Sequence, residues 1–528
     1  MNRSITPGLA AFAAIALLIG GAFAGLLTEG FTNLPAAIGA FDSYLFRVAR
    51  FTLWQALLST FLSVAPAILV ARALSRHPDF IGRGLILKLF AVPLALPAIV
   101  AALGILALLG GAGLFATFWG DGWPGIYGLS GILIAHVFFN LPLATRLLLE
   151  ALDTIPTDQW RLAAQLGMNA RSAFTFIEWP ALRRALPAVA GLVFMLCITS
   201  FTIVLTLGGG PRATTLEVAI YQALRFDFDP ARAVAVTVLQ IVLTAIVIAA
   251  LTRLGANVAG DANLAVSRRK AVSPSMPETI ANSIIVLLAA LFVLSPMVAT
   301  IIAGLRADLA RLVTENAVQK AALASITFAS FSAVLCLTIS WSLVAARWNL
   351  ASIRRSATPS FLERIFDTGA GFVLIVPPIV IGSGWFLLLR NHVDVFSVAP
   401  IMVVAVNAVM AMPFAIRAIR PAHDAAATRH DRIASQLGIT GWNRLRLIDW
   451  PVLRRPMMTG LAFAMALSLG DLGVIALFGS DAVQTLPYLL LGRMGSYRTQ
   501  DAAGIALLLG ALCLALMLIA DRLGRTSE

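Results

Sequence analysis

Charged side chains are scarce in this chain. Only 12% of its 528 residues are Asp, Glu, Lys or Arg, whereas soluble domains carry about 25%. With 59% hydrophobic residues, a water-soluble protein of this composition would have too few polar side chains to cover its surface. The apolar residues also form continuous runs of about 20, the length of a bilayer-spanning helix, and do not alternate as barrel strands do. The composition therefore predicts an all-α polytopic membrane protein in the lipid bilayer.

Cysteine is nearly absent, and so are the motifs of catalysis. The chain has 3 cysteines (Cys197, Cys336 and Cys513), which lie in apolar runs without metal-ligand spacing, so no disulfide framework or metal site is expected. No Gly-Lys-Ser/Thr phosphate loop occurs, and we expect no bound cofactor and no ATP hydrolysis by this chain. An intramembrane enzyme would need an acid–base or nucleophile set, which we do not find.

Twelve apolar runs are candidate membrane spans. They are residues 9–27, 51–71, 85–109, 128–149, 187–207, 233–252, 280–303, 322–346, 369–389, 397–416, 457–478 and 502–520. With a cytoplasmic N-terminus, 28 of the 39 Lys and Arg residues fall in inside segments and 11 in outside segments, as the positive-inside rule requires. The net charge of +13 therefore indicates no nucleic-acid partner. We expect an inner-membrane protein with both termini in the cytoplasm, whose first run is an uncleaved helix; a cleaved signal peptide is the alternative.

One polar stretch occurs twice at a constant offset of 271 residues. Each copy (165–184 and 436–455) contains Gln-Leu-Gly, then Ile, an acid, Trp and Pro, and then two arginines. We expect a short helix that is capped by Asp158 and ends at Gly167, and a second one that ends at Gly438. Such helices are too short to be stable alone in water. Each is therefore expected to pack between the membrane domain and a partner, rather than to be a plain connecting loop.

The repeat extends over the whole chain. Gly104 recurs as Gly384 at an offset of 280, and a linker rich in Gly, Pro and Ser lies at 255–278. We therefore expect two tandem halves of six spans each, residues 1–260 and 261–528. An even number of spans in each half makes the two repeats run in the same direction across the membrane.

The spacing Gly-x9-Ile-x-x-Pro after an alanine-rich turn resembles the cytoplasmic "EAA" loop of the permeases of ATP-binding-cassette importers. In that family the loop forms a coupling helix that docks on the ATPase subunit. The resemblance implies coupling loops at 150–187 and 417–457. The matching positions are Ala163, Gly167, Ile177, Pro180, Ala434, Gly438, Ile448 and Pro451. The chain departs from the pattern at the position of the motif's glutamate, which is Arg161 in one copy and Arg432 in the other.

A single chain with two such loops resembles the iron and thiamine branch of these permeases. Residues 127–142 and 207–217 are similar to the thiamine and thiamine pyrophosphate permeases of that branch. The resemblance implies two six-helix halves of the type I importer fold, two copies of a partner ATPase that binds ATP and Mg²⁺, and a periplasmic thiamine-binding protein. It implies import of thiamine or its phosphates. Import of ferric iron and ion-coupled secondary transport are the alternatives.

One charged residue, Asp471, lies well inside a predicted span, and its repeat equivalent is Ser200. A charge at a helix centre costs about 2.5–3.5 kcal/mol on insertion scales, so Asp471 is expected to face a cavity or a partner. We expect both residues to line the substrate path, where Asp471 favours a cation such as thiazolium; an interhelical hydrogen bond is the alternative. Interhelical hydrogen bonds are expected for His136, Asn140, Asn407 and Gln240.

Overall fold

The computed structural model describes residues 5–524, except for residues 33, 121–122, 124, 209, 254–275, 354–357, 367–375 and 440. The described residues form helices and no strand. Among them, 11 helices are long and apolar enough to cross a membrane. The all-α polytopic class expected from composition is thus confirmed. The predicted linker at 255–278 lies almost entirely outside the described residues.

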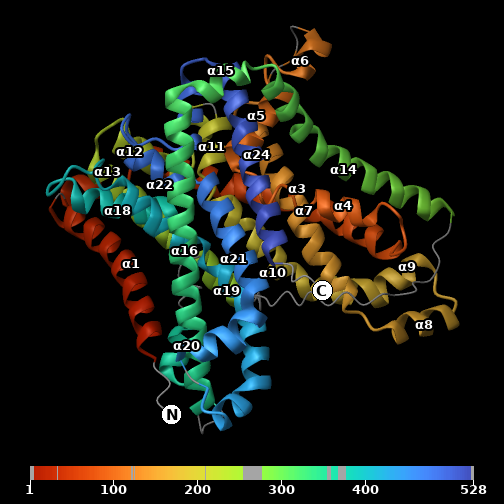
Figure 1. The fold of residues 1–528 in the computed structure, drawn as a ribbon. Coiled ribbons are helices and arrows are strands. Elements are labelled where there is room, and N and C mark those ends of the chain that lie inside the picture. Colours follow the sequence, from red (N-terminus) through yellow and green to blue (C-terminus); the bar gives the residue numbers. More distant parts are fainter. Residues whose placement is uncertain are drawn as a thin grey trace. The chain divides into compact units, whose positions relative to one another are not determined.

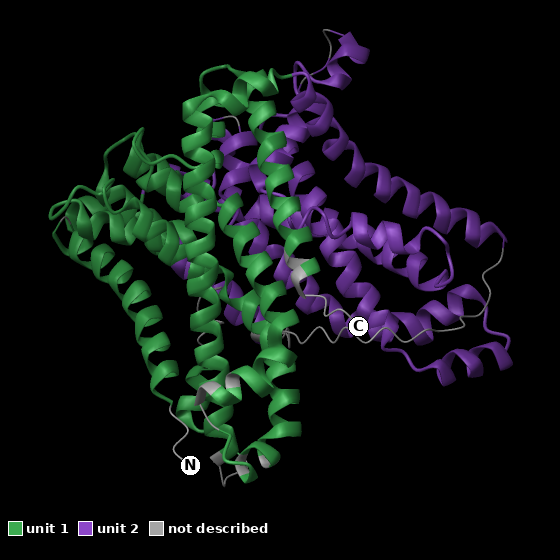
Figure 2. Cartoon of the chain, viewed as in Figure 1, with its two compact units in different colours: residues 1–41, 219–238, 307–528 green, residues 42–218, 239–306 purple. Residues whose placement is uncertain are grey.

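The chain forms two compact units, drawn in different colours in Figure 2. Unit 1 comprises residues 1–41, 219–238 and 307–528, and unit 2 comprises residues 42–218 and 239–306. The helices of unit 1 are α1 (Thr6–Thr32), α2 (Leu34–Gly39), α15 (Leu309–Thr314), α16 (Asn316–Ile353), α18 (Pro378–Leu389), α19 (Ala399–Gln436), α20 (Gly441–Arg444), α21 (Trp450–Gly470), α22 (Gly473–Phe478), α23 (Leu486–Gly495) and α24 (Thr499–Gly524). The helices of unit 2 are α3 (Ser43–Arg76), α4 (Arg83–Leu89), α5 (Ala98–Leu109), α6 (Leu114–Trp119), α7 (Leu129–Asp153), α8 (Thr157–Gln165), α9 (Ala170–Ala173), α10 (Trp179–Ile198), α11 (Thr202–Leu207) and α14 (Met276–Leu305). Two helices, α12 (Leu216–Arg225) and α13 (Pro230–Arg253), contribute residues to both units (Figure 1).

The first helix of each sequence half packs in the compact unit of the other half. In unit 1, α1 packs against α16 and α18, and a Cβ on Gly384 would lie only 2.1 Å from the carbonyl oxygen of Ala22. In unit 2, α14 packs against α5, and a Cβ on Gly104 would lie 2.4 Å from the carbonyl oxygen of Pro296. Small residues allow such close backbone approach between membrane helices. The repeated glycine is therefore the contact point of an exchanged helix in both units. The halves 1–260 and 261–528 stay a prediction about the sequence repeat, because the compact units divide the chain differently.

Several predicted spans differ in extent from the helices. The expected span at 85–109 is interrupted between α4 and α5, where Pro97 precedes the first residue of α5 with extended backbone angles and has no N–H to donate. The span at 397–416 continues to Gln436, because α19 accommodates two internal prolines. The span at 369–389 falls partly outside the described residues, and α18 covers its remainder.

The structural repeat is visible in single hydrogen bonds. In unit 2 the hydroxyl of Thr52 on α3 accepts a hydrogen bond from the backbone N–H of Leu216 at 3.1 Å. In unit 1 the hydroxyl of Ser325 on α16 accepts one from the N–H of Leu486 at 2.8 Å. Both acceptors are buried on long helices, and both donors open a short helix. A hydroxyl inside the helix bundle thus satisfies an N–H group that the start of a helix leaves without an intrahelical partner.

Candidate coupling segments and transport path

Each polar repeat contains the same helix end. Gly167 and Gly438 have left-handed backbone angles, with φ of +61° and +64°. The carbonyl of Ala163 accepts the N–H of Met168 at 3.0 Å, and the carbonyl of Ala434 accepts the N–H of Ile439 at 2.9 Å. This bond across five residues is that of the Schellman motif, which requires glycine at the left-handed position. In each copy the alanine of the pattern thus accepts the hydrogen bond that closes the helix-ending turn, and the glycine adopts the left-handed backbone angles of that turn. Both alanines are buried.

The chain then passes through a π-helical turn in both copies. Phe174–Glu178 and Leu445–Asp449 are π-helical, and each precedes a Trp-Pro pair that opens a long membrane helix. Pro180 and Pro451 lie in the first turn of α10 and α21, where a helix has no need of the N–H that proline lacks. Ile177 is buried, and Ile448 is partly buried. The predicted positions therefore mark one continuous path from the polar segment into a membrane helix.

Two expectations about these segments were wrong. Asp158 does not cap α8, because the position before the helix is Pro156 and Asp158 lies in its first turn, where its carboxylate contacts Arg161 at 3.4 Å. In the second copy no separate short helix forms, since α19 runs without a break to Gln436 before the turn at Gly438.

Ion pairs attach the first segment to α3. The carboxylate of Glu178 accepts hydrogen bonds from the guanidinium groups of Arg72 at 2.7 Å and of Arg76 at 2.5 Å. Glu178 and Arg76 are buried, and Arg76 also lies over the ring of Trp160 in α8 at 5.3 Å. Breaking a buried pair by removing one partner costs about 3–5 kcal/mol. Arg76 thus contacts both α8, through Trp160, and Glu178, which directly precedes α10.

The second segment is attached by different residues. Asp449, at the repeat position of Glu178, contacts Arg444 at 3.4 Å, and Arg444 also pairs with Asp431 at 2.5 Å. The indole N–H of Trp348 on α16 donates to Asp431 at 3.0 Å. The sequence analysis missed these anchors. The signal that could have found them is the acid that occupies the same place in both copies, Glu178 and Asp449.

Each segment also presents apolar side chains to its surroundings. Eight such residues are between 37% and 69% exposed. In the first copy they are Leu162, Leu166, Phe176 and Trp179, and in the second copy they are Ile433, Leu437, Leu447 and Trp450. The two sets correspond one to one at the offset of 271. We call them the two apolar docking sets.

The residues expected in the substrate path lie at helix breaks. Ser200 lies between α10 and α11, and Asp471 lies between α21 and α22, so each membrane helix is interrupted at the same repeat position. One carboxylate oxygen of Asp471 accepts the N–H of Gly473 at 3.2 Å, and the other is buried without a hydrogen-bond partner among the described residues. Non-helical backbone at membrane depth is tolerated only inside protein or along a cavity. The two residues belong to different compact units.

The other intramembrane polar residues mostly join helices, as expected. His136 Nδ1 lies 2.8 Å from the hydroxyl of Ser59, Asn140 donates to Cys197 Sγ at 3.3 Å, and Asn407 donates to the hydroxyl of Ser468 at 3.0 Å. The prediction was wrong for Gln240, whose buried side-chain amide has no hydrogen-bond partner within the part of the chain that the structure describes.

Comparison with known proteins agrees with this architecture. The family model described as the inner membrane component of binding-protein-dependent transport systems matches residues 63–260 and 349–528. The thiamine transport system permease protein ThiP of Brucella abortus (strain 2308) is 56% identical over 525 residues, which are 99% of this chain and 95% of that protein. The proteins of the same name from Escherichia coli K12 and Salmonella typhimurium LT2 are 42% and 41% identical, over 91% and 98% of this chain and 90% and 96% of their own lengths. The chain therefore belongs to the family of inner membrane components of binding-protein-dependent transport systems.

Proposed function

We propose that the chain is the permease subunit of an ATP-binding-cassette importer that carries thiamine or its phosphates into the cytoplasm. A periplasmic thiamine-binding protein delivers the cargo, and a separate ATPase, which binds ATP and Mg²⁺, supplies the energy. The permease holds no cofactor of its own, and both of its termini lie in the cytoplasm. Support for the cargo comes from relatives that share the full length of the chain and are named thiamine transport permeases.

The observation that carries this proposal is the pair of apolar docking sets. Exposed apolar side chains that gather on an otherwise polar surface mark protein-binding sites. The same four positions are apolar in both copies, although the residues themselves differ at two of the four. Each set therefore docks one copy of the ATPase, and the complex contains two copies. The buried alanines, the left-handed glycines and the Ile-x-x-Pro turns hold each set in position.

The anchors define how movement of the ATPase reaches the membrane. In unit 2 a displaced α8 pulls on Glu178, which is bonded to α3 and directly precedes α10. In unit 1 the corresponding acid, Asp449, directly precedes α21. The far ends of α10 and α21 are the breaks at Ser200 and Asp471. The energy of ATP binding drives transport because docking differs between the inward-open and outward-open states.

The breaks provide the chemistry of the path. A carboxylate oxygen of Asp471 without a hydrogen-bond partner is available to a cation, and the thiazolium ring of thiamine carries a permanent positive charge. Backbone groups freed by each break provide further hydrogen-bond partners for a polar cargo. Ser200, at the equivalent repeat position in the other unit, carries a neutral hydroxyl, so the two breaks differ in charge.

The test is reconstitution of the chain in proteoliposomes with its ATPase and binding protein. We expect uptake of labelled thiamine that requires ATP and all three components. Thiamine uptake by the chain alone under an ion gradient would overturn the proposal in favour of a secondary transporter. Uptake of labelled ferric iron in place of thiamine would refute thiamine as the substrate, but it would not refute the assignment as the permease of an ATP-driven importer.

A further inference from the structure

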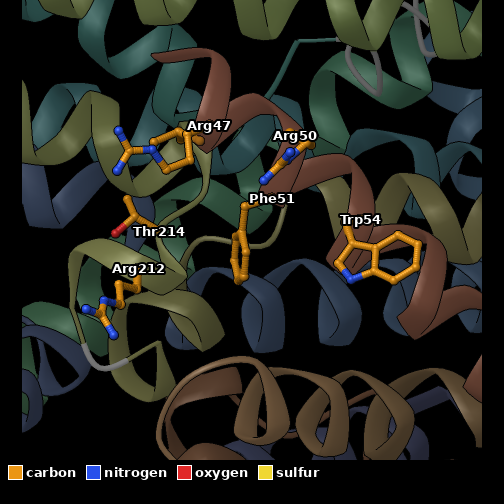
Figure 3. Close-up of a pocket in the computed structure, with 7 residues that line it drawn as sticks. Arg47, Arg50, Phe51, Trp54, Arg212 and Thr214 are labelled. Carbon is orange, nitrogen blue, oxygen red and sulfur yellow. The ribbon is translucent and has the colours of Figure 1, made fainter. Parts of the chain in front are cut away.

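A pocket of about 470 Å³ lies in unit 2, at the end of α3 where that helix begins. It is lined by Arg47, Val48, Arg50, Phe51, Trp54, Arg212 and Thr214, six of which are labelled in Figure 3. Five of the lining residues come from α3 and two from the segment that precedes α12. None of them belongs to the coupling segments or the helix breaks. With a cytoplasmic N-terminus, this end of α3 is the outer end.

Helix geometry brings the α3 residues to one side. Arg47, Arg50, Phe51 and Trp54 are spaced three and four residues apart, so they share one face of the helix. The segment that carries Arg212 and Thr214 is fixed to α3, because Thr52 on α3 accepts the N–H of Leu216, two residues after Thr214. Arg212 is thereby held opposite α3, although it is 162 residues away from Arg50 in the chain.

The three arginines of the pocket are exposed and have neither an ion pair nor a hydrogen bond with any described residue. Among the described residues that line the pocket there is no carboxylate. The nearest acid that follows in the chain, Glu217, is buried, and its desolvation raises its pKa to about 8. Glu217 is therefore mostly protonated at pH 7 and does not offset the arginine charge.

Arginines near the ends of α15 and α23 in unit 1 are arranged differently. Arg311 and Arg493 both contact the carboxylates of Asp501 and Glu315, and Arg498 contacts Asp501 at 3.1 Å. Those arginines are satisfied within the protein and have a structural role. The pocket arginines have no such partners, which leaves them available to an anionic ligand.

We propose that this pocket binds a phosphate ester, and that its arginines distinguish phosphorylated thiamine from free thiamine. Guanidinium groups bind phosphate oxygens through charge-assisted, often bidentate hydrogen bonds. Phe51 and Trp54 add aromatic faces on which a ring attached to the phosphate can stack. Free thiamine is a cation and is repelled by three unpaired arginines, whereas its diphosphate ester carries net negative charge. The phosphate of a lipid headgroup has the same chemistry and is the other source of such a ligand. The assignment to cargo rests on the proposed function.

The test compares Arg47→Gln, Arg50→Gln, Arg212→Gln and the triple variant with Arg306→Gln. Arg306 is an exposed arginine of the same unit, outside the pocket and without an ion pair to a described residue, and serves as the matched control. Uptake of thiamine and of thiamine pyrophosphate is measured in proteoliposomes of phosphatidylcholine alone and with added phosphatidylglycerol. Loss of one charge-assisted hydrogen bond is expected to raise the KM for thiamine pyrophosphate about tenfold in each single variant, while thiamine uptake changes less than twofold.

Each outcome decides between the possibilities. A selective loss of thiamine pyrophosphate uptake supports the pocket as a cargo site. If phosphatidylglycerol stimulates the wild type but not the triple variant, and cargo preference is unchanged, the phosphate comes from lipid. Unchanged cargo preference together with an unchanged lipid response overturns the proposal, as does an equal loss of both cargoes. If the wild type transports neither cargo, the proposed function fails instead.

Discussion

The docking sets predict how strongly a single leucine holds the ATPase. Leu166 is 63% exposed and Leu437 is 68% exposed, and they occupy equivalent positions next to the left-handed glycines. Full burial of a leucine side chain is worth about 1.5–3 kcal/mol. Covering the exposed part of either side chain therefore contributes about 1–2 kcal/mol to docking, most of which is lost in Leu166→Ala or Leu437→Ala. This corresponds to a Kd for the ATPase that is about 5–30 times higher in each single variant.

The double variant sharpens this prediction. Because each position contacts a different ATPase copy, the losses should add to about 2–4 kcal/mol for assembly of the complex with both copies. The assay measures binding of the purified ATPase to the permease in nanodiscs, together with ATP-driven uptake. Ile81→Ala is the matched control, since Ile81 is fully exposed and lies outside both docking sets. Membrane abundance should not change, because exposed side chains contribute little to folding. ATPase affinity that stays unchanged in the double variant would refute the docking sets.

Three further substitutions test the segments and the path. Gly167→Ala and Gly438→Ala place a Cβ on a left-handed residue, which costs about 1–2 kcal/mol; we expect ATP hydrolysis to become uncoupled from uptake, with Asn milder than Ala at both positions. Glu178→Gln removes the charge between two arginines and should lower the free energy of unfolding by up to about 3 kcal/mol in a melting assay. Asp158→Asn, in an exposed ion pair, should lower it by less than about 0.5 kcal/mol in the same assay. Asp471→Asn should reduce thiamine uptake at unchanged membrane abundance; full uptake would remove Asp471 from the path.

Most structural features of the two coupling segments could be predicted from the repeat at a constant offset of 271 residues. The repeat identified the helix-ending glycines, whose left-handed angles follow from local backbone sterics, and it paired Ser200 with Asp471. It did not predict the helix breaks at these two residues, because both lie inside continuous apolar runs. Local rules were enough for the glycines, because each turn depends on residues within about six positions of one another. The same local rules failed for Asp158, since Pro156 takes the position before the helix and Asp158 follows it by two residues.

Contacts between distant residues were beyond the sequence. The sequence showed that Gly104 and Gly384 are equivalent in the repeat. Neither stretch of sequence predicted that each glycine lies against a backbone carbonyl of the first helix of the other half. The arginine pocket is a similar case. Arg50 and Arg212 lie 162 residues apart in the chain, and their proximity depends on long-range contacts such as the hydrogen bond from Leu216 to Thr52.

The two coupling segments correspond in position but not in attachment, and this difference has a functional consequence. Glu178 bonds to two arginines of α3, so the first segment is tied to a neighbouring membrane helix by a buried, doubly charged contact. Asp449 bonds to Arg444, five residues earlier in the same segment, and the link to α16 runs through the indole of Trp348 instead. A carboxylate acceptor makes the hydrogen bond from Trp348 charge-assisted as well, and Arg347 on α16 adds an ion pair to Asp424 on α19 at 3.0 Å. Both segments are therefore tied to a neighbouring membrane helix by charge-assisted contacts, but at different places. A substitution of Glu178 acts directly before α10, whereas a substitution of Asp431 acts near the end of α19, before the turn at Gly438.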